Sequence, residues 1–244
     1  MPFLRANGLR LYYEIKGSGP RLLWLTGTGA DLRRAPSPFT TKMPERFEVL
    51  ALDQRGLGQS DKPDGPYTVA HYADDAAALL NALGWSKCHV MGVSFGGMVA
   101  QELAISYPTK IDKLVLCCCS TGGPGGSSYP LHELEHLPVE EKMRLRIMRT
   151  DKRQNEHWIA THPAEYKALF DKGVADAKLY ADEPRRKEGA AWQLDARARH
   201  DTYHRIDKIK MPVLVCGGKY DGQAEPGVVE ELARRIPGAE LKFF

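Results

Sequence analysis

The chain has 244 residues, a length that can bury a large core in one domain and leaves room for an insertion. Its 34 basic and 31 acidic side chains are scattered throughout and give a formal net charge of +3. The sequence contains no basic run interleaved with aromatic residues, the pattern that would indicate nucleic-acid binding. It also contains no apolar run long enough to cross a bilayer. The N-terminal residues lack the pattern of a signal peptide, so we expect a cytoplasmic protein without a membrane partner.

Short apolar runs alternate with helical periodicity through the first half of the chain. Asn7-Gly8 joins the first two runs as a hairpin turn, whereas the later runs are separated by helical segments. This alternation indicates a mostly parallel sheet with crossover helices. The pattern predicts strands at residues 3–6, 9–15, 22–26, 47–52, 87–93 and 111–119, and helices at 69–83 and 95–106.

The composition changes at Thr121. After a glycine-rich linker the chain is charged and helix-favouring, with no strand signal before residue 211. A strand at 211–217, a helix at 227–236 and a strand at 239–244 then resume the earlier alternation. We therefore expect a core made of residues 1–120 and 206–244, with residues 121–205 inserted between them as a helical cap.

The five cysteines do not have the spacing of a disulfide framework. Three of them are consecutive, at positions 117–119, and end an apolar run in which a free thiol behaves as a small buried side chain. Neighbouring residues of a strand point to opposite faces of the sheet, so these thiols do not converge on one ion. We therefore expect no metal site.

Ser94 lies in the sequence Gly-Val-Ser-Phe-Gly at residues 92–96, between a predicted strand and a predicted helix. Such a sharp turn strains the serine backbone and holds the hydroxyl at a helix N-terminus, where developing negative charge is stabilised. A glycine-rich turn that happens to contain a serine is the alternative, but the flanking strand and helix favour a catalytic nucleophile. At these residues the chain resembles the α/β-hydrolase family, whose fold is a mostly parallel central sheet with flanking helices.

The resemblance implies further site residues, because the family places its acid and its base after the nucleophile in the chain. Asp221 follows a buried strand and is the expected acid. The main-chain N–H groups of Phe95 and Thr28 are the expected oxyanion hole. Here the chain departs from the family, since Thr26-Gly27 stands where the family has His-Gly.

Residues 53–60 resemble another loop of the family, Asp-x-Arg-Gly-x-Gly-x-Ser. We interpret this loop as structural, with Asp53 and Arg55 tying neighbouring turns together. The resemblance implies no cofactor.

No histidine follows Asp221, although the family's base lies in a loop after the last strand. We therefore expect the last helix and the histidine loop to be missing. Four explanations remain open: a truncated hydrolase, a C-terminal segment absent from this sequence, another histidine as the base, or a protein that only binds. His200 and His204 are the candidates for a substitute base, whereas His89 precedes Ser94 in its strand and is expected in the core.

The leading hypothesis is a serine hydrolase that cleaves carboxylic esters through an acyl-enzyme on Ser94. Ester cleavage is the least demanding chemistry for such a site, because it needs only an oxyanion hole and a leaving group. A carbon–carbon bond hydrolase of meta-cleavage products and a lactonase are alternatives within the family. A non-catalytic protein that binds a ligand in the same pocket is the alternative outside the enzymes.

Two further expectations concern surfaces. We expect the apolar residues of the cap, among them Trp158, Phe170 and Trp192, to form mainly the core of the cap, and a few of them to face Ser94, because pockets form between core and lid. The strand at 239–244 is an apolar sheet edge, and such edges recruit another chain, so a homodimer is also expected.

Overall fold

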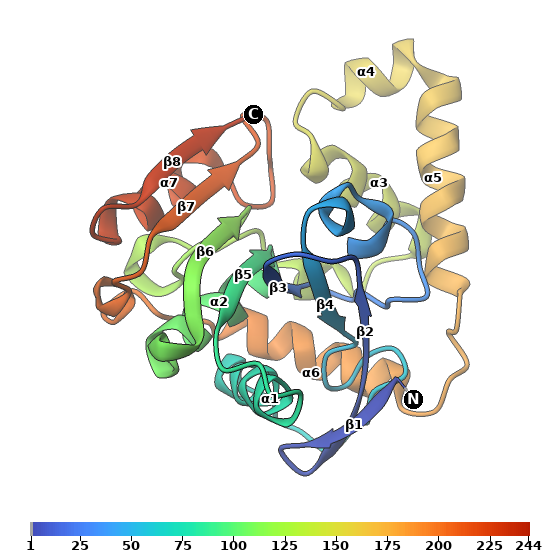
Figure 1. Cartoon of the computed structure of the whole chain (residues 1–244). Helices are drawn as coiled ribbons and strands as arrows, with labels where there is room; N and C mark the ends of the chain where they lie inside the picture. The colour runs from blue at the N-terminus through green and yellow to red at the C-terminus, as the bar shows by residue number, and fades with distance from the viewer. Residues whose placement is uncertain (1) are drawn as a thin grey trace.

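One eight-stranded sheet organises residues 2–244, the part of the chain that the computed structural model describes (Figure 1). Its strands are β1 (Phe3–Ala6), β2 (Leu9–Lys16), β3 (Arg21–Leu25), β4 (Glu48–Leu52), β5 (Cys88–Val93), β6 (Ile111–Cys117), β7 (Val213–Gly217) and β8 (Glu240–Phe243). The spatial order is β1-β2-β4-β3-β5-β6-β7-β8. The first two strands run antiparallel to their neighbours, whereas every neighbouring pair from β4 to β8 is parallel. The prediction of a mostly parallel sheet is confirmed.

β6 ends two residues earlier than the sequence pattern predicts, at Cys117. The reason is local, because Cys118 has a φ of 51°, in the left-handed region that interrupts an extended strand. The Cys118 N–H still donates to the carbonyl oxygen of Cys216, at 2.8 Å. The chain therefore turns away from the sheet while it remains attached to β7.

The helices also follow the predicted order. They are α1 (Val69–Ala82), α2 (Phe95–Ser106), α3 (Val139–Thr150), α4 (Glu156–Thr161), α5 (Pro163–Lys178), α6 (Arg186–Ala198) and α7 (Pro226–Arg235). Thr68 begins α1 as its N-cap, since its hydroxyl oxygen accepts from the His71 N–H. None of the helices in residues 2–244 combines the length and the apolar character that a membrane span requires.

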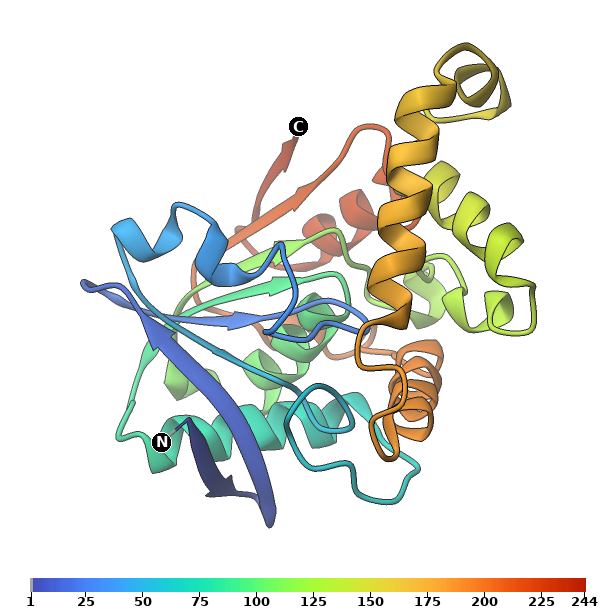
Figure 2. The same ribbon diagram turned by 90° about the vertical axis from the view of Figure 1, so that its right-hand side faces the viewer.

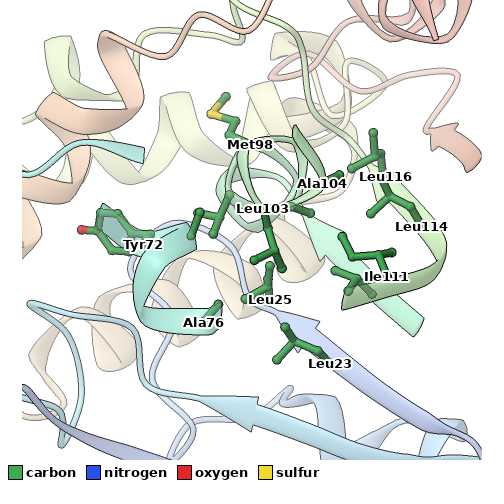
Figure 3. Packing of buried hydrophobic residues seen from close by; sticks show 14 of the residues in the cluster. Leu23, Leu25, Tyr72, Ala76, Met98, Leu103, Ala104, Ile111, Leu114 and Leu116 are labelled. Carbon is green, nitrogen blue, oxygen red and sulfur yellow. The ribbon is translucent and has the colours of Figure 1, made fainter. Parts of the chain in front are cut away.

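α2 is the most deeply buried helix and fixes the centre of the core (Figure 3). It packs between α1 and the strands β3, β5 and β6. Its fully buried Leu103 contributes about 2 kcal/mol through removal of apolar surface from water. The side chains around α2 in Figure 3 come from one helix and two strands. They are Tyr72 and Ala76 of α1, Leu23 and Leu25 of β3, and Ile111, Leu114 and Leu116 of β6.

The loop at 53–60 has the structural role expected from the sequence. One carboxylate oxygen of Asp53 accepts the Leu32 N–H at 2.8 Å, and the other accepts the Gln59 N–H at 2.9 Å. Arg55 binds Asp75 of α1 through two hydrogen bonds, of 2.6 and 2.7 Å, and both side chains are buried. These contacts join the loops after β3 and β4 to each other and to α1.

The segment between β6 and β7 contains α3, α4, α5 and α6. α5 runs along the outside of the molecule, and none of its residues is buried (Figure 2). α6 is different, because one side of it rests directly on the core. Gly189 of α6 lies so close to Gly56 that a Cβ there would overlap the Gly56 carbonyl. This contact brings the rest of α6 across the loops that follow the strands.

The buried ion pair between Arg55 and Asp75 should contribute to the stability of the fold, and this can be tested by substitution. Replacing Asp75→Asn leaves a buried guanidinium without its counter-charge and should lower the free energy of unfolding by about 3–5 kcal/mol. The matched control is Asp112→Asn in the exposed pair Lys87–Asp112, where we expect a loss below about 1 kcal/mol. Urea denaturation of both variants measures the difference, and equal losses would contradict the structural role of Arg55.

Candidate active site

Ser94 is the residue between β5 and α2, and its backbone is strained. Its φ of 54° and ψ of −117° lie outside the regions that a side chain normally permits, a state that costs about 1–3 kcal/mol. Glycines on both sides make this turn possible. A Cβ at Gly92 would overlap the Gly96 carbonyl, and one at Gly96 would overlap the Leu25 carbonyl at the end of β3. The turn therefore locks β3, β5 and α2 together around a half-buried serine.

The loop after β3 lies beside this serine. A Cβ built on Gly27 would stand 3.6 Å from the Ser94 Cβ, an ordinary contact distance. Among the hydrogen bonds of residues 2–244, none is donated by the main-chain N–H of Thr28 or of Phe95, the two groups expected in the oxyanion hole. The buried Thr28 hydroxyl also has no partner within that range. The surroundings of Ser94 thus contain uncommitted donors.

α6 holds this loop in place. The side-chain oxygen of Gln193 accepts the Gly29 N–H at 2.8 Å, directly after Thr28. Further along the loop, the buried carboxylate of Asp31 pairs with Arg186 of α6 at 3.3 Å. The position of the Thr28 amide therefore depends on a helix that is more than 150 residues away in sequence.

Asp221 lies in the loop after β7, as expected. One of its carboxylate oxygens accepts the N–H groups of Gln223 and Ala224, at 2.7 and 3.0 Å. These bonds fix the orientation of the carboxylate. Burial, together with the neighbouring Asp221 carboxylate, raises the pKa of the Cys118 thiol to about 12. A hollow of about 300 Å³ opens beside these two side chains and extends to Phe244.

Ser94 and Asp221 lie at the same edge of the sheet. Ser94 follows β5 and Asp221 follows β7, and β6 is the single strand between them. Two strand spacings separate these positions by roughly 10 Å.

The histidines considered as substitute bases do not lie between Ser94 and Asp221. His200 is buried, and its Nε2 makes a 3.3 Å hydrogen bond with the carbonyl of Ser120, to which Gln101 of α2 also donates. Gln101 is seven residues beyond Ser94, which places His200 beside the middle of α2 rather than at its N-terminus. Burial lowers the pKa of His200 to about 4, so it is also a weak base.

The other two histidines are no better placed. His204 is exposed, and its ring packs edge-on against the ring of Tyr203. His89 lies in β5 and packs edge-on against the ring of Phe47, consistent with a structural residue. The hydrogen bonds of residues 2–244 include none between a histidine and Ser94.

The three aromatic side chains named from the sequence have packing roles, as expected for most apolar residues of this segment. Trp158 stacks on His162 of the cap itself. Phe170 lines a groove between α3 and α5, and Trp192 packs over Gly65 of the core. These rings hold the cap together or attach it to the core.

The cap residue that reaches the loop beside Ser94 is polar, and sequence reasoning missed it. Gln193 is one of three residues at four-residue spacing, with Gly189 and Arg197, that form a buried stripe on α6. The four-residue spacing of these three positions is the only sequence pattern that indicates a buried stripe. Glutamine and arginine at such positions are also typical of a solvated helix face, so the pattern does not distinguish the two.

The potential metal-ligating side chains do not converge on one point in the described part of the chain. No group of three or more histidine, cysteine, aspartate or glutamate side chains in residues 2–244 is arranged to hold an ion. Cys117 and Cys216, on adjacent strands, are free thiols whose sulfur atoms lie 3.1 Å apart.

A family model described as alpha/beta hydrolase fold matches residues 25–244. The chain belongs to the α/β-hydrolase family. A poly(3-hydroxyalkanoate) depolymerase of Ectopseudomonas oleovorans is 33% identical over 224 residues, which cover 90% of this chain and 75% of the relative. The enol-lactonase structure from Burkholderia xenovorans has a TM-score of 0.77 at 26% identity, covering 100% of this chain and 91% of the neighbour. A thermophilic esterase from Thermogutta terrifontis has a TM-score of 0.72 at 25% identity, covering 100% and 88%.

These comparisons confirm the fold class predicted from the sequence. The eight-stranded sheet, parallel from β4 to β8, is an α/β-hydrolase fold. The family and the names of the relatives support a hydrolase.

The burial of His200 predicts a pH dependence of stability. Its pKa is about 4 in the folded protein and about 6.5 in an unfolded chain, so the unfolded state binds more protons between these values. Stability should therefore fall by about 3 kcal/mol as the pH drops from about 6.5 to about 4. Urea denaturation across this pH range measures how the free energy of unfolding changes with pH. His200→Gln should remove most of this pH dependence, whereas His204→Gln, at an exposed position, should leave it unchanged. A slope that is unchanged in His200→Gln would count against this assignment.

Proposed function

We propose that this chain is a hydrolase of carboxylic esters that acts through an acyl-enzyme on Ser94. The observation that carries the proposal is the strained serine at the N-terminus of α2, next to the uncommitted N–H groups of Thr28 and Phe95. Strain of this kind persists where the surrounding structure enforces it, and it clusters at active sites.

In the proposed reaction a base takes the Ser94 proton while the oxygen attacks the ester carbonyl. The carbonyl becomes an oxyanion that accepts hydrogen bonds from the Thr28 and Phe95 N–H groups. The tetrahedral intermediate expels the alcohol, which takes the proton from the base. Water then attacks the acyl group by the same route and releases the acid. Asp221 orients the imidazole of the base and stabilises its charge.

The relatives favour this class of reaction over carbon–carbon cleavage. The neighbours at 25–26% identity include an esterase and an enol-lactonase, and a lactone is a cyclic ester. The two meta-cleavage product hydrolase structures are 20% and 21% identical, so that likeness concerns the fold. A non-catalytic ligand-binding protein is the second candidate, favoured by the lack of a histidine hydrogen-bonded to Ser94 in residues 2–244.

Imidazole added to the solution tests the nucleophile without assuming which residue supplies the base. We expect the 244-residue chain to hydrolyse 4-nitrophenyl acetate slowly and to accelerate at least tenfold with imidazole, after subtraction of the reaction without protein. Ser94→Ala should abolish this acceleration and labelling by a fluorophosphonate probe. Ser106→Ala, at the far end of α2, is the matched control and should behave like the original chain.

Two outcomes separate the candidates. If Ser94→Ala keeps the imidazole-dependent rate, Ser94 is not the nucleophile. If neither labelling nor acceleration occurs in the folded original chain, the hydrolase proposal is overturned.

Asp221→Asn tests the proposed acid in the same assay. Asparagine retains an oxygen that can accept the N–H groups of Gln223 and Ala224, so the loop should keep its structure. We expect the imidazole-dependent rate to fall at least tenfold, because the amide neither orients nor stabilises the charged ring. Asp207→Asn, at an exposed position, is the control. A loss below twofold would indicate that another group acts as the acid.

A further inference from the structure

A cavity of about 200 Å³ lies next to the site, between α2, α6 and the chain that follows β6. Its lining includes Met98 of α2, Arg197 and His200, together with three serines, Ser120, Ser127 and Ser128. No acidic residue lines it. The cavity therefore combines hydroxyl groups with a cationic side chain and has no negative charge of its own.

The arginine in this cavity is buried without a counter-ion. Arg197 is only 5% exposed, and none of the ion pairs in residues 2–244 includes it. Its Nη1 donates to the carbonyl of Tyr129 at 2.7 Å, whereas Nε and Nη2 are buried and have no partner within the described residues. Burial and the nearby charge of Arg146 lower the pKa of Arg197 to about 10, so it remains charged at neutral pH. A buried charge in this state destabilises the folded protein unless an anion pairs with it.

The unpartnered atoms are the ones that bind carboxylates elsewhere in this protein. Arg55 uses Nε and Nη2 to hold the two oxygens of Asp75, and Arg234 uses the same pair toward Glu231. This edge of a guanidinium matches the two oxygens of a carboxylate in spacing and plane. In Arg197 the same edge has no partner within residues 2–244.

The cavity is within one helical turn of the proposed site on two helices. Met98, labelled in Figure 3, donates its N–H to the Ser94 carbonyl at 3.3 Å and lines the cavity. On α6, Gln193 binds the loop beside Ser94, and Arg197 follows four residues later, about 6 Å along the helix. Ser94 and the cavity are therefore separated by about one turn of α2.

We propose that Arg197 binds a carboxylate at the far end of the acyl group, so that the substrates are esters or lactones of short dicarboxylic acids. The assignment rests on the proposed function of Ser94 and adds the class of substrate. The Nε and Nη2 donors of Arg197 receive the carboxylate, and hydroxyls of the cavity serines provide further donors. Arg197 is thus a specificity residue that distinguishes charged from neutral acyl groups.

Calorimetric titration of the full chain with adipate and with its neutral analogue adipamide tests the binding of the charge. We expect adipate to bind at least tenfold more tightly than adipamide, and Arg197→Gln to remove at least tenfold of the adipate affinity. The control is Arg199→Gln, directly after the last residue of α6, whose exposed guanidinium pairs with Asp195, and it should stay within twofold. Arg197→Lys keeps the charge without the fork and should give an intermediate affinity.

Several results would overturn the proposal. Equal binding of adipate and adipamide by the original chain would do so even if Arg197→Gln failed to fold. Adipate affinity unchanged in a folded Arg197→Gln variant would do so as well, and tighter binding of inorganic phosphate than of adipate would exclude the carboxylate. Binding needs no reaction at Ser94, so Ser94→Ala should bind adipate normally. A failed titration therefore leaves the nucleophile assignment intact, and failed labelling of Ser94 leaves the carboxylate site intact.

Discussion

The close backbone approach at Ser94 is the constraint on which the rest of the site depends. Gly92 and Gly96 allow β5, α2 and the end of β3 to meet without side chains between them. Any Cβ at these positions would push α2 away from the sheet, and α2 is the helix on which the core packs. The same contact therefore holds the core together and strains the candidate nucleophile. Stability and the exposure of the hydroxyl cannot be altered separately at this turn.

A second close contact, between Gly56 and Gly189, places α6 across the loops. From there the buried stripe of α6 reaches two functional positions in succession. Gln193 fixes the loop that carries the Thr28 amide, and Arg197 lines the neighbouring cavity. A helix inserted far along the sequence thus connects the proposed oxyanion hole with the proposed carboxylate site. Changes in how α6 docks would affect both together.

Much of the fold was predictable because it follows from local patterns. Ser94 between a strand and a helix, the glycines beside it and the order of strands and helices are properties of short segments. The structural role of Asp53 and Arg55 was predictable as well, because loops of this kind need buried polar anchors. By contrast, the positions of His200 and Trp192 were not predictable. Each depends on a partner far away in the sequence, Ser120 for His200 and Gly65 for Trp192.

The sequence by itself determined the α/β architecture, the strained turn at Ser94 and the place of Asp221 after a buried strand, because each is encoded within a few neighbouring residues. Only the tertiary structure decided what surrounds them. It placed His200 beside the middle of α2, brought Gln193 to the loop next to Ser94 and left the Nε and Nη2 of Arg197 without a partner in residues 2–244. The physical reason is that burial and hydrogen-bond satisfaction are set by how α6 packs on the core. The spacing of polar residues along one helix does not show whether each side chain contacts water, bonds to a main-chain group or is buried as an unpaired charge.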